Sequence, residues 1–165
     1  MLFPTVSMGA HVSAVPNHQV GRTTSLETRY IVAAAGNLGY ELDLQKLSQD
    51  EMELIKKQIA QYKRIRRQFS LGLITDWQIR FLKISLHGIF VSEDGKQIVF
   101  SHVQILARSA YRIPTLRLRG LDPKAEYKNV ETGEVFGGDE LMYAGITIPR
   151  VRQDFSATMI IFEKM

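Results

Sequence analysis

Residues 38–44, which read LGYELDL, decide the fold of the first half of this chain because apolar and polar side chains alternate through them. Alternation of this kind predicts a β-strand with one buried face. Helical patterns flank the stretch on both sides. A strand between two covering helices is typical of a slice of an α/β barrel or of an open α/β sheet.

The helix after this strand is predicted from Ser48 to Arg67. Ser48 and Glu51 have the spacing of a capping box, with Leu47 and Met52 as a hydrophobic staple. Apolar residues then recur every three or four positions and form one apolar stripe, made of Met52, Ile55, Ile59, Tyr62 and Ile65. Lysines and arginines near the end of the helix oppose its dipole, which is a structural explanation for the basic run.

The helix before the strand has a similar start signal. Thr24 and Glu27 also have capping-box spacing, and the apolar residues continue to Ala35 before Gly36 and Asn37 end the helix. The local order is therefore helix, strand, helix.

Strand patterns replace helical ones after Gly72. Turn signals such as Asp94-Gly95 separate the apolar runs. Strands are predicted at residues 79–91, 97–106, 115–119, 126–130, 145–148 and 154–162. The sequence thus predicts an α/β domain over residues 1–70, followed by an antiparallel β-sandwich domain over residues 71–165.

Composition narrows the class of protein. The chain has 165 residues, of which 45% are hydrophobic, so it can form one ordinary core or part of a larger one. It has no cysteine, which excludes disulfides and thiolate metal sites and fits a reducing compartment. Neither a signal peptide nor a membrane-spanning run is visible, so we expect a cytoplasmic protein. The net charge of +4 is too modest to indicate nucleic-acid binding.

Candidates for chemistry gather in residues 8–19, MGAHVSAVPNHQ, which read as a polar loop of the kind that carries sites. The spacing of His11 and His18 matches no zinc motif, and His87 and His102 add no ligand pattern. Ser13 lies in no nucleophile elbow. We expect no metal and no cofactor. On spacing alone, both loop histidines are explained as partners of neighbouring backbone groups.

Longer strings resemble glycoside hydrolase family 36, the melibiase-type α-galactosidases. Residues 3–22, FPTVSMGAHVSAVPNHQVGR, resemble the segment that follows the acid/base strand of that family. The resemblance continues through residues 26–29, 36–44 and the helix ending at Arg66, and then through residues 91–94, 116–123 and 136–142 of the C-terminal β domain. Residues 72–80, GLITDWQIR, depart from the family pattern.

The resemblance implies retaining hydrolysis of α-galactosides such as melibiose and raffinose, on a (β/α)8 barrel followed by a β-sandwich. Residues 1–70 would then be the last strand and helix units of the barrel. The family's nucleophile and acid/base aspartates belong to segments that precede Met1, and no residue here matches them. We therefore expect the chain alone to be inactive, as a truncated reading frame or an excised piece.

Carboxylates within the chain do not change that expectation. A retaining glycosidase needs two carboxylates about 5–5.5 Å apart on different strands. Glu41 and Asp43 share one predicted strand, whereas Asp139 and Glu140 follow two glycines and are predicted to form a turn or a cap. No catalytic residue is assigned within these 165 residues.

Active sites of such barrels lie on the loops after the strands. The resemblance therefore suggests that four residues contact the substrate or support those that do, namely His11, Ser13, Asn17 and His18. We expect an α-galactoside partner only within a whole enzyme, possible self-association through the apolar stripe, and neither nucleic acid nor membrane as a partner. The alternative is an autonomous β-sandwich that binds carbohydrate or has a structural role, against which stands the single tryptophan, Trp77.

Overall fold

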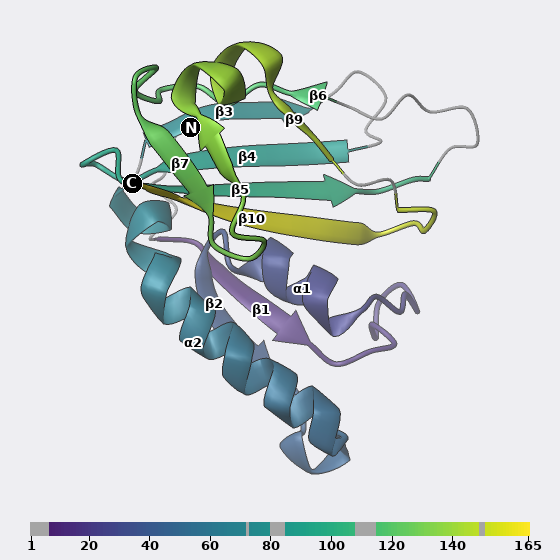
Figure 1. The fold of residues 1–165 in the computed structure, drawn as a ribbon. Coiled ribbons are helices and arrows are strands. Elements are labelled where there is room, and N and C mark those ends of the chain that lie inside the picture. Colours follow the sequence, from purple (N-terminus) through teal and green to yellow (C-terminus); the bar gives the residue numbers. More distant parts are fainter. Residues whose placement is uncertain (1–6, 72, 80–84, 108–114, 149–150) are drawn as a thin grey trace. The chain divides into compact units, whose positions relative to one another are not determined.

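The computed structural model describes residues 7–71, 73–79, 85–107, 115–148 and 151–165, and the side chains of residues 68–79 lie outside this description (Figure 1). The chain forms two compact units, Met1–Ser70 and Leu71–Met165. The first unit is a small helix and strand unit. The second is built on an antiparallel sheet.

Two parallel strands form the sheet of the first unit. Strand β1 (Gly9–Ser13) pairs with β2 (Asn37–Glu41), and helix α1 (Leu26–Ala33) connects them. Parallel strands need such a crossover because the end of one strand and the start of the next lie at opposite ends of the sheet. The short 3₁₀ helix η2 (Leu44–Lys46) and the long helix α2 (Gln49–Leu71) follow β2 (Figure 1).

The strands differ from the predicted ones in a consistent way. Residues 9–13 form β1 and are not a loop, because one strongly apolar residue, Val12, is too little to produce a recognisable pattern. Strand β2 ends at Glu41, earlier than predicted. There Asp43 caps η2, its Oδ1 accepting from the backbone N–H of Gln45 at 3.0 Å.

The N-cap of α1 lies one residue later than predicted. Ser25 is the N-cap, and its Oγ accepts from the backbone N–H of Thr28 at 3.1 Å. Thr28 is buried. The predicted pairing of Thr24 with Glu27 is therefore wrong, because the Ser25 side chain occupies the capping position.

The capping box of α2 is confirmed. The backbone N–H of Ser48 donates to Oε2 of Glu51 at 2.9 Å, and the N–H of Glu51 donates to Oγ of Ser48 at 3.2 Å. These hydrogen bonds from Ser48 lower the pKa of the Glu51 carboxyl. Along the helix, Ile55 and Ile65 are buried, so the apolar stripe faces inward as predicted.

Three tyrosines join α1, α2 and the start of β2 through their hydroxyl groups. Tyr30 donates to Gln61 at 2.9 Å, Tyr40 to Gln58 at 2.9 Å and Tyr62 to the carbonyl of Gly36 at 2.8 Å. Burial raises the pKa of Tyr40 to about 12. A buried polar group is costly unless it is paired, so these contacts fix how the helix is positioned on the strand.

The second unit has a six-stranded antiparallel sheet in the order β3-β4-β5-β10-β7-β8. Its strands are β3 (Leu73–Ile79), β4 (Ser85–Val91), β5 (Gln97–Gln104), β7 (Glu126–Asn129), β8 (Val135–Gly137) and β10 (Ser156–Lys164). A much smaller layer contains β6 (Thr115–Leu116), β9 (Ile146–Thr147) and the π-helix η3 (Glu140–Ala144).

The core of this unit lies between the large sheet and the small layer. The sheet contributes Ile98, Phe100 and Phe162, and the opposite side contributes Leu141 from η3 and Leu118 from the segment after β6. All five are almost completely buried. An antiparallel second half is therefore observed, with a second layer made of two short strands and one helical turn.

The strand predicted over residues 79–91 is confirmed for residues 85–91, which form β4, but it is wrong as one continuous strand. The structure has two strands here, β3 and β4, which pair antiparallel, and residues 80–84 between them lie outside the described residues. The sequence RFLK at residues 80–83 contains none of the usual turn residues, so no signal marked the reversal. The divergent segment 72–80 contributes β3, and β3 and β8 are the two described strands of the second unit that were not predicted.

Close backbone contacts hold η3 in place. A Cβ at Gly138 would overlap the carbonyl group of Asp122, so only glycine fits there. Gly145, which ends η3, has φ of +81°, and a Cβ there would lie 2.5 Å from the carbonyl oxygen of Leu116.

Replacing Gly138 with alanine should lower the free energy of unfolding by about 3 kcal/mol, because the backbone of Asp122 must move to admit the methyl group. Urea denaturation measures this loss. Gly95→Ala is the matched control, since Gly95 has a positive φ but open space around it, and should cost about 1 kcal/mol. Equal losses in the two variants would contradict the steric explanation.

Candidate functional site

The β1-β2 pair has two unlike faces. One carries Val12, which is fully buried, and Tyr40, which contacts Gln58 on α2, so this is the face that the helices cover. Ala10 and Leu38 share this face, and alternation along the strands places the other six residues on the opposite face. They are Gly9, His11, Ser13, Asn37, Gly39 and Glu41.

An imidazole and a carboxylate meet on that opposite face. Nδ1 of His11 lies 3.4 Å from Oε1 of Glu41, with side chains that are 49% and 63% exposed. Ser13 is directly opposite Glu41 in the parallel register, and His11 is opposite Gly39. A Cβ at Gly39 would lie 3.2 Å from Cδ2 of His11, so the ring lies against bare backbone. An exposed pair of this kind contributes at most about 1 kcal/mol to stability.

The end of β1 is tied to the start of α1 by one arginine. Nη1 of Arg29 donates to the carbonyl of Ser13 at 2.5 Å, and Nε donates to the carbonyl of Thr24 at 3.2 Å. Sequence reasoning missed Arg29. A signal was present, since a cation in the first turns of a helix is unusual unless it has another partner.

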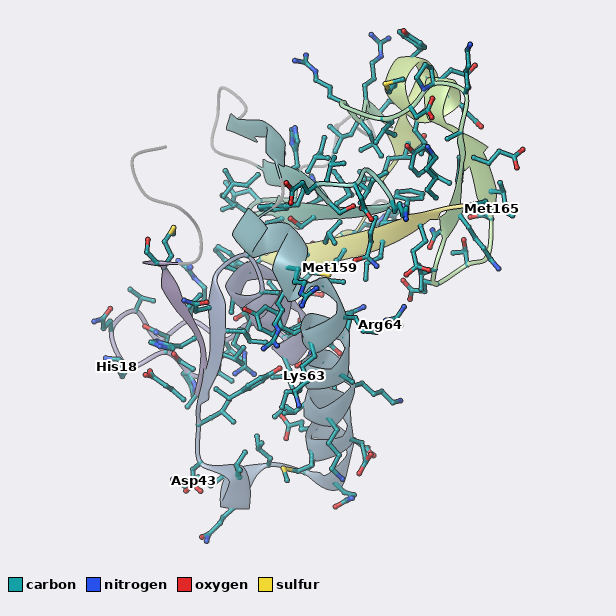
Figure 2. All side chains as sticks on the ribbon, turned by 90° about the vertical axis from the view of Figure 1, so that its left-hand side faces the viewer. His18, Asp43, Lys63, Arg64, Met159 and Met165 are labelled. Atoms are coloured by element: carbon teal, nitrogen blue, oxygen red, sulfur yellow. The ribbon has the colours of Figure 1, made fainter. Side chains whose placement is uncertain are left out.

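Asn17 organises the loop between Arg29's two contacts. Its Oδ1 accepts from the backbone N–H groups of Gln19 at 3.0 Å and Val20 at 3.1 Å, and its own N–H donates to the carbonyl of Arg22 at 2.8 Å. These bonds give Asn17 a structural role in the loop. His18 lies exposed on the same loop, and Figure 2 shows it far from Asp43.

The structure therefore brings His11 and Ser13 onto one face with Glu41, and leaves Asn17 and His18 on the following loop. Contact of these four residues with substrate stays a prediction. Sequence reasoning weighed Glu41 only with Asp43. In both strands a glycine stands two residues before the paired residue, as Gly9-x-His11 in β1 and Gly39-x-Glu41 in β2. This shared spacing could have suggested that His11 and Glu41 pair.

Other carboxylates cap local turns. Oδ2 of Asp43 lies 3.6 Å from Nζ of Lys46. Oδ1 of Asp139 accepts from the N–H of Glu140 at 2.8 Å, which confirms the predicted cap. Within the described residues, no group of three or more histidine, cysteine, aspartate or glutamate side chains is arranged to hold a metal ion. The helices in the described ranges include none that is long and apolar enough to cross a membrane.

His87 and His102 face each other on β4 and β5 and are buried. They extend the core face of the sheet, because they alternate with Ile89 and Phe100. Burial, together with the neighbouring His87, lowers the pKa of His102 to about 4. His102 is therefore neutral near pH 7.

Known proteins and family models match almost the whole chain. The family model Melibiase matches residues 1–72, and the model described as Glycosyl hydrolase family 36 C-terminal domain matches residues 87–162. Alpha-galactosidase AgaA of Geobacillus stearothermophilus is 43% identical over 96% of this chain and 22% of that protein. Alpha-galactosidase Mel36A of Lactobacillus acidophilus is 40% identical over 99% of this chain and 22% of its own length.

Solved structures of α-galactosidases also match the chain. The crystal structure of GH36 alpha-galactosidase AgaA matches with a TM-score of 0.92 and 42% identity, over 98% of this chain and 22% of that one. The galactosidase domain of the alpha-galactosidase-sucrose kinase AgaSK matches with a TM-score of 0.91 and 37% identity, over 99% of this chain and 23% of that one. The chain thus spans about a fifth of the length of these relatives.

The buried imidazole of His102 should make the second unit less stable in acid. Above pH 6.5 the folded and unfolded states both hold it neutral. As the pH falls from 6.5 to about 4, His102 binds a proton in the unfolded state but not in the folded state. The free energy of unfolding therefore falls by on the order of 2 kcal/mol. Urea denaturation from pH 7.5 to 4.5 should show a weaker pH dependence in His102→Gln than in the parent chain. Exposed His18→Gln is the control and should follow the parent; an unchanged slope in His102→Gln would refute the assignment.

Proposed function

We propose, since the chain belongs to glycoside hydrolase family 36, that it is the C-terminal part of an α-galactosidase. Residues 1–70 would complete a (β/α)8 barrel, and residues 71–165 would form a β-sandwich domain. The whole enzyme would hydrolyse α-galactosides such as melibiose and raffinose with retention of configuration. The relatives that match the chain carry the name alpha-galactosidase.

The parallel pair β1-β2 is the observation that carries this proposal. Its two strands are joined by α1 and covered on one face by helices, which is the repeating unit of a (β/α)8 barrel. Within the described residues each strand has one strand neighbour, so each offers an unpaired edge to which further barrel strands can pair.

The chain would contribute part of the wall of the active site and not the reacting carboxylates. Asp43 and Asp139 cap local turns, and the family resemblance assigns the nucleophile and the acid/base to segments outside this sequence. His11 and Ser13 on β1, and Asn17 and His18 on the loop after it, would lie at the catalytic end of the barrel, where such sites are built.

The alternative is an autonomous carbohydrate-binding module. Such a module stacks sugars on exposed aromatic rings. The side chain of Trp77 lies outside the described ones, and the exposed Tyr143 on η3 is a single ring rather than a platform. The match of residues 1–72 to the Melibiase model also favours the enzyme, because it covers the unit that a sugar-binding β module would not need.

The isolated chain should not hydrolyse a chromogenic α-galactoside, because both catalytic carboxylates would be missing and with them nucleophilic and general-acid catalysis. Release of nitrophenol from p-nitrophenyl α-galactoside measures this. Asp43→Asn and Asp139→Asn show where any trace activity comes from, because the activity of a contaminating enzyme would be the same in preparations of these variants. Turnover that either substitution abolishes would mean that the chain has its own active site.

A chimera tests the positive side of the proposal. AgaA of Geobacillus stearothermophilus, with its matching segment replaced by these 165 residues, should hydrolyse the same substrate because the chain supplies the missing barrel units. The same graft taken from Mel36A is the matched control, and AgaA without the segment is the blank. If the Mel36A graft is active and the graft of this chain is not, the proposal is contradicted.

A further inference from the structure

The face of β1-β2 opposite the helices has an unusual composition. The interior of a (β/α)8 barrel is normally packed with bulky branched residues. Here that face carries two glycines and four polar residues, which are Gly9, His11, Ser13, Asn37, Gly39 and Glu41. A layer with this composition cannot fill a packed core. It is suited to line a polar cavity.

We propose that His11 is a substrate-contacting residue whose Nε2 hydrogen-bonds a hydroxyl group of the galactoside, and that Glu41 is a positioning residue that orients its ring. This inference rests on the proposed function, because the cavity in front of this face exists only in a closed barrel. The hydrogen bond would help determine which sugar binds.

Gly9 and Gly39 leave the space that the His11 imidazole occupies. A Cβ at Gly39 would lie 3.2 Å from Cδ2 of His11, which is tighter than ordinary van der Waals contact, and a Cβ at Gly9 would lie 3.9 Å from Nε2. The ring therefore lies close to the position that a side chain at either residue would occupy. A larger residue at position 39 would push it away from the sheet.

Glu41 determines which ring nitrogen carries the proton. Oε1 of Glu41 faces Nδ1 of His11 at 3.4 Å, and a carboxylate can only accept a hydrogen bond. In the proposed arrangement Nδ1 carries the hydrogen, and Nε2 of the neutral imidazole is left as an acceptor. A carboxylate behind an imidazole orients the ring in the same way in catalytic and metal sites.

A sugar hydroxyl is the ligand that fits this geometry. It can donate to a neutral Nε2 and can accept from a protonated one. Among the described residues no third metal-ligating side chain joins His11 and Glu41, so a bound metal ion is not supported. Glu41 ends β2, and Ser13 ends β1 beside it, so the pair is near the carboxyl ends of the strands, where barrel active sites lie.

Two substitutions of His11 separate contact with substrate from a purely structural pairing. In His11→Asn the amide can still reach Glu41 from the position of Nδ1, but nothing polar remains at the position of Nε2. In His11→Gln the amide extends to the position of Nε2. In the active chimera, kcat/KM should fall about tenfold in His11→Asn and no more than about threefold in His11→Gln. The reverse order would overturn the inference.

Substrate analogues test the contact itself. For p-nitrophenyl α-galactosides from which each sugar hydroxyl is removed in turn, the parent chimera and His11→Asn should differ about tenfold for all but one. For the analogue that lacks the contacted hydroxyl they should be about equal. A constant ratio across all analogues would exclude a hydrogen bond from His11 to the sugar.

Glu41 is tested in the same chimera. Glu41→Ala should lower kcat/KM about threefold in the parent and have no further effect in the His11→Asn background, because Glu41 acts through the ring. Exposed Glu53→Gln on α2 is the control and should leave kcat/KM unchanged. Additive effects of Glu41→Ala and His11→Asn would remove Glu41 from the proposal. An inactive unmodified chimera contradicts the proposed function, whereas an active one with unaffected His11 variants contradicts this inference alone.

Discussion

The contact between Tyr62 and the start of β2 is the interaction on which the first unit depends. Its hydroxyl donates to the carbonyl of Gly36 at 2.8 Å and accepts from the N–H of Leu38 at 3.3 Å, so one side chain on α2 engages the backbone on both sides of Asn37. A helix that packs only through aliphatic side chains can slide along a strand at little cost. A partly buried pair of hydrogen bonds removes that freedom, because sliding would leave the backbone groups without partners.

A fixed helix on one face of β2 also defines the other face. Because Val12 and Tyr40 are directed to the helices, alternation places His11 and Glu41 on the opposite face. The polar face is thus a consequence of how the apolar face is packed. Residues that never touch the pair, such as Tyr62, are therefore part of what positions it.

Periodicity and capping could predict α2, because Ser48, Glu51 and the apolar stripe lie close together in sequence and act locally. Turn signals could predict most strands of the second unit for the same reason. Strand β1 could not be predicted, since Val12 is its one strongly apolar side chain and its pairing partner β2 is distant in the sequence. The helical turn η3 depends on the backbones of Asp122 and Leu116, which approach Gly138 and Gly145 from other segments.

The candidate site was harder to predict than the fold, and the reason is register. His11, Ser13, Asn17 and His18 could be selected as polar residues of one stretch, but the partner of His11 comes from another strand. Which residue of β2 lies beside His11 depends on the length of α1 and on the bond from Arg29 to Ser13, and the sequence does not show which group Arg29 contacts. Catalytic sites of barrel enzymes are assembled from several strands in this way. Under the proposed function, the β1-β2 pair would fix the geometry of one part of such a site without holding its reacting groups.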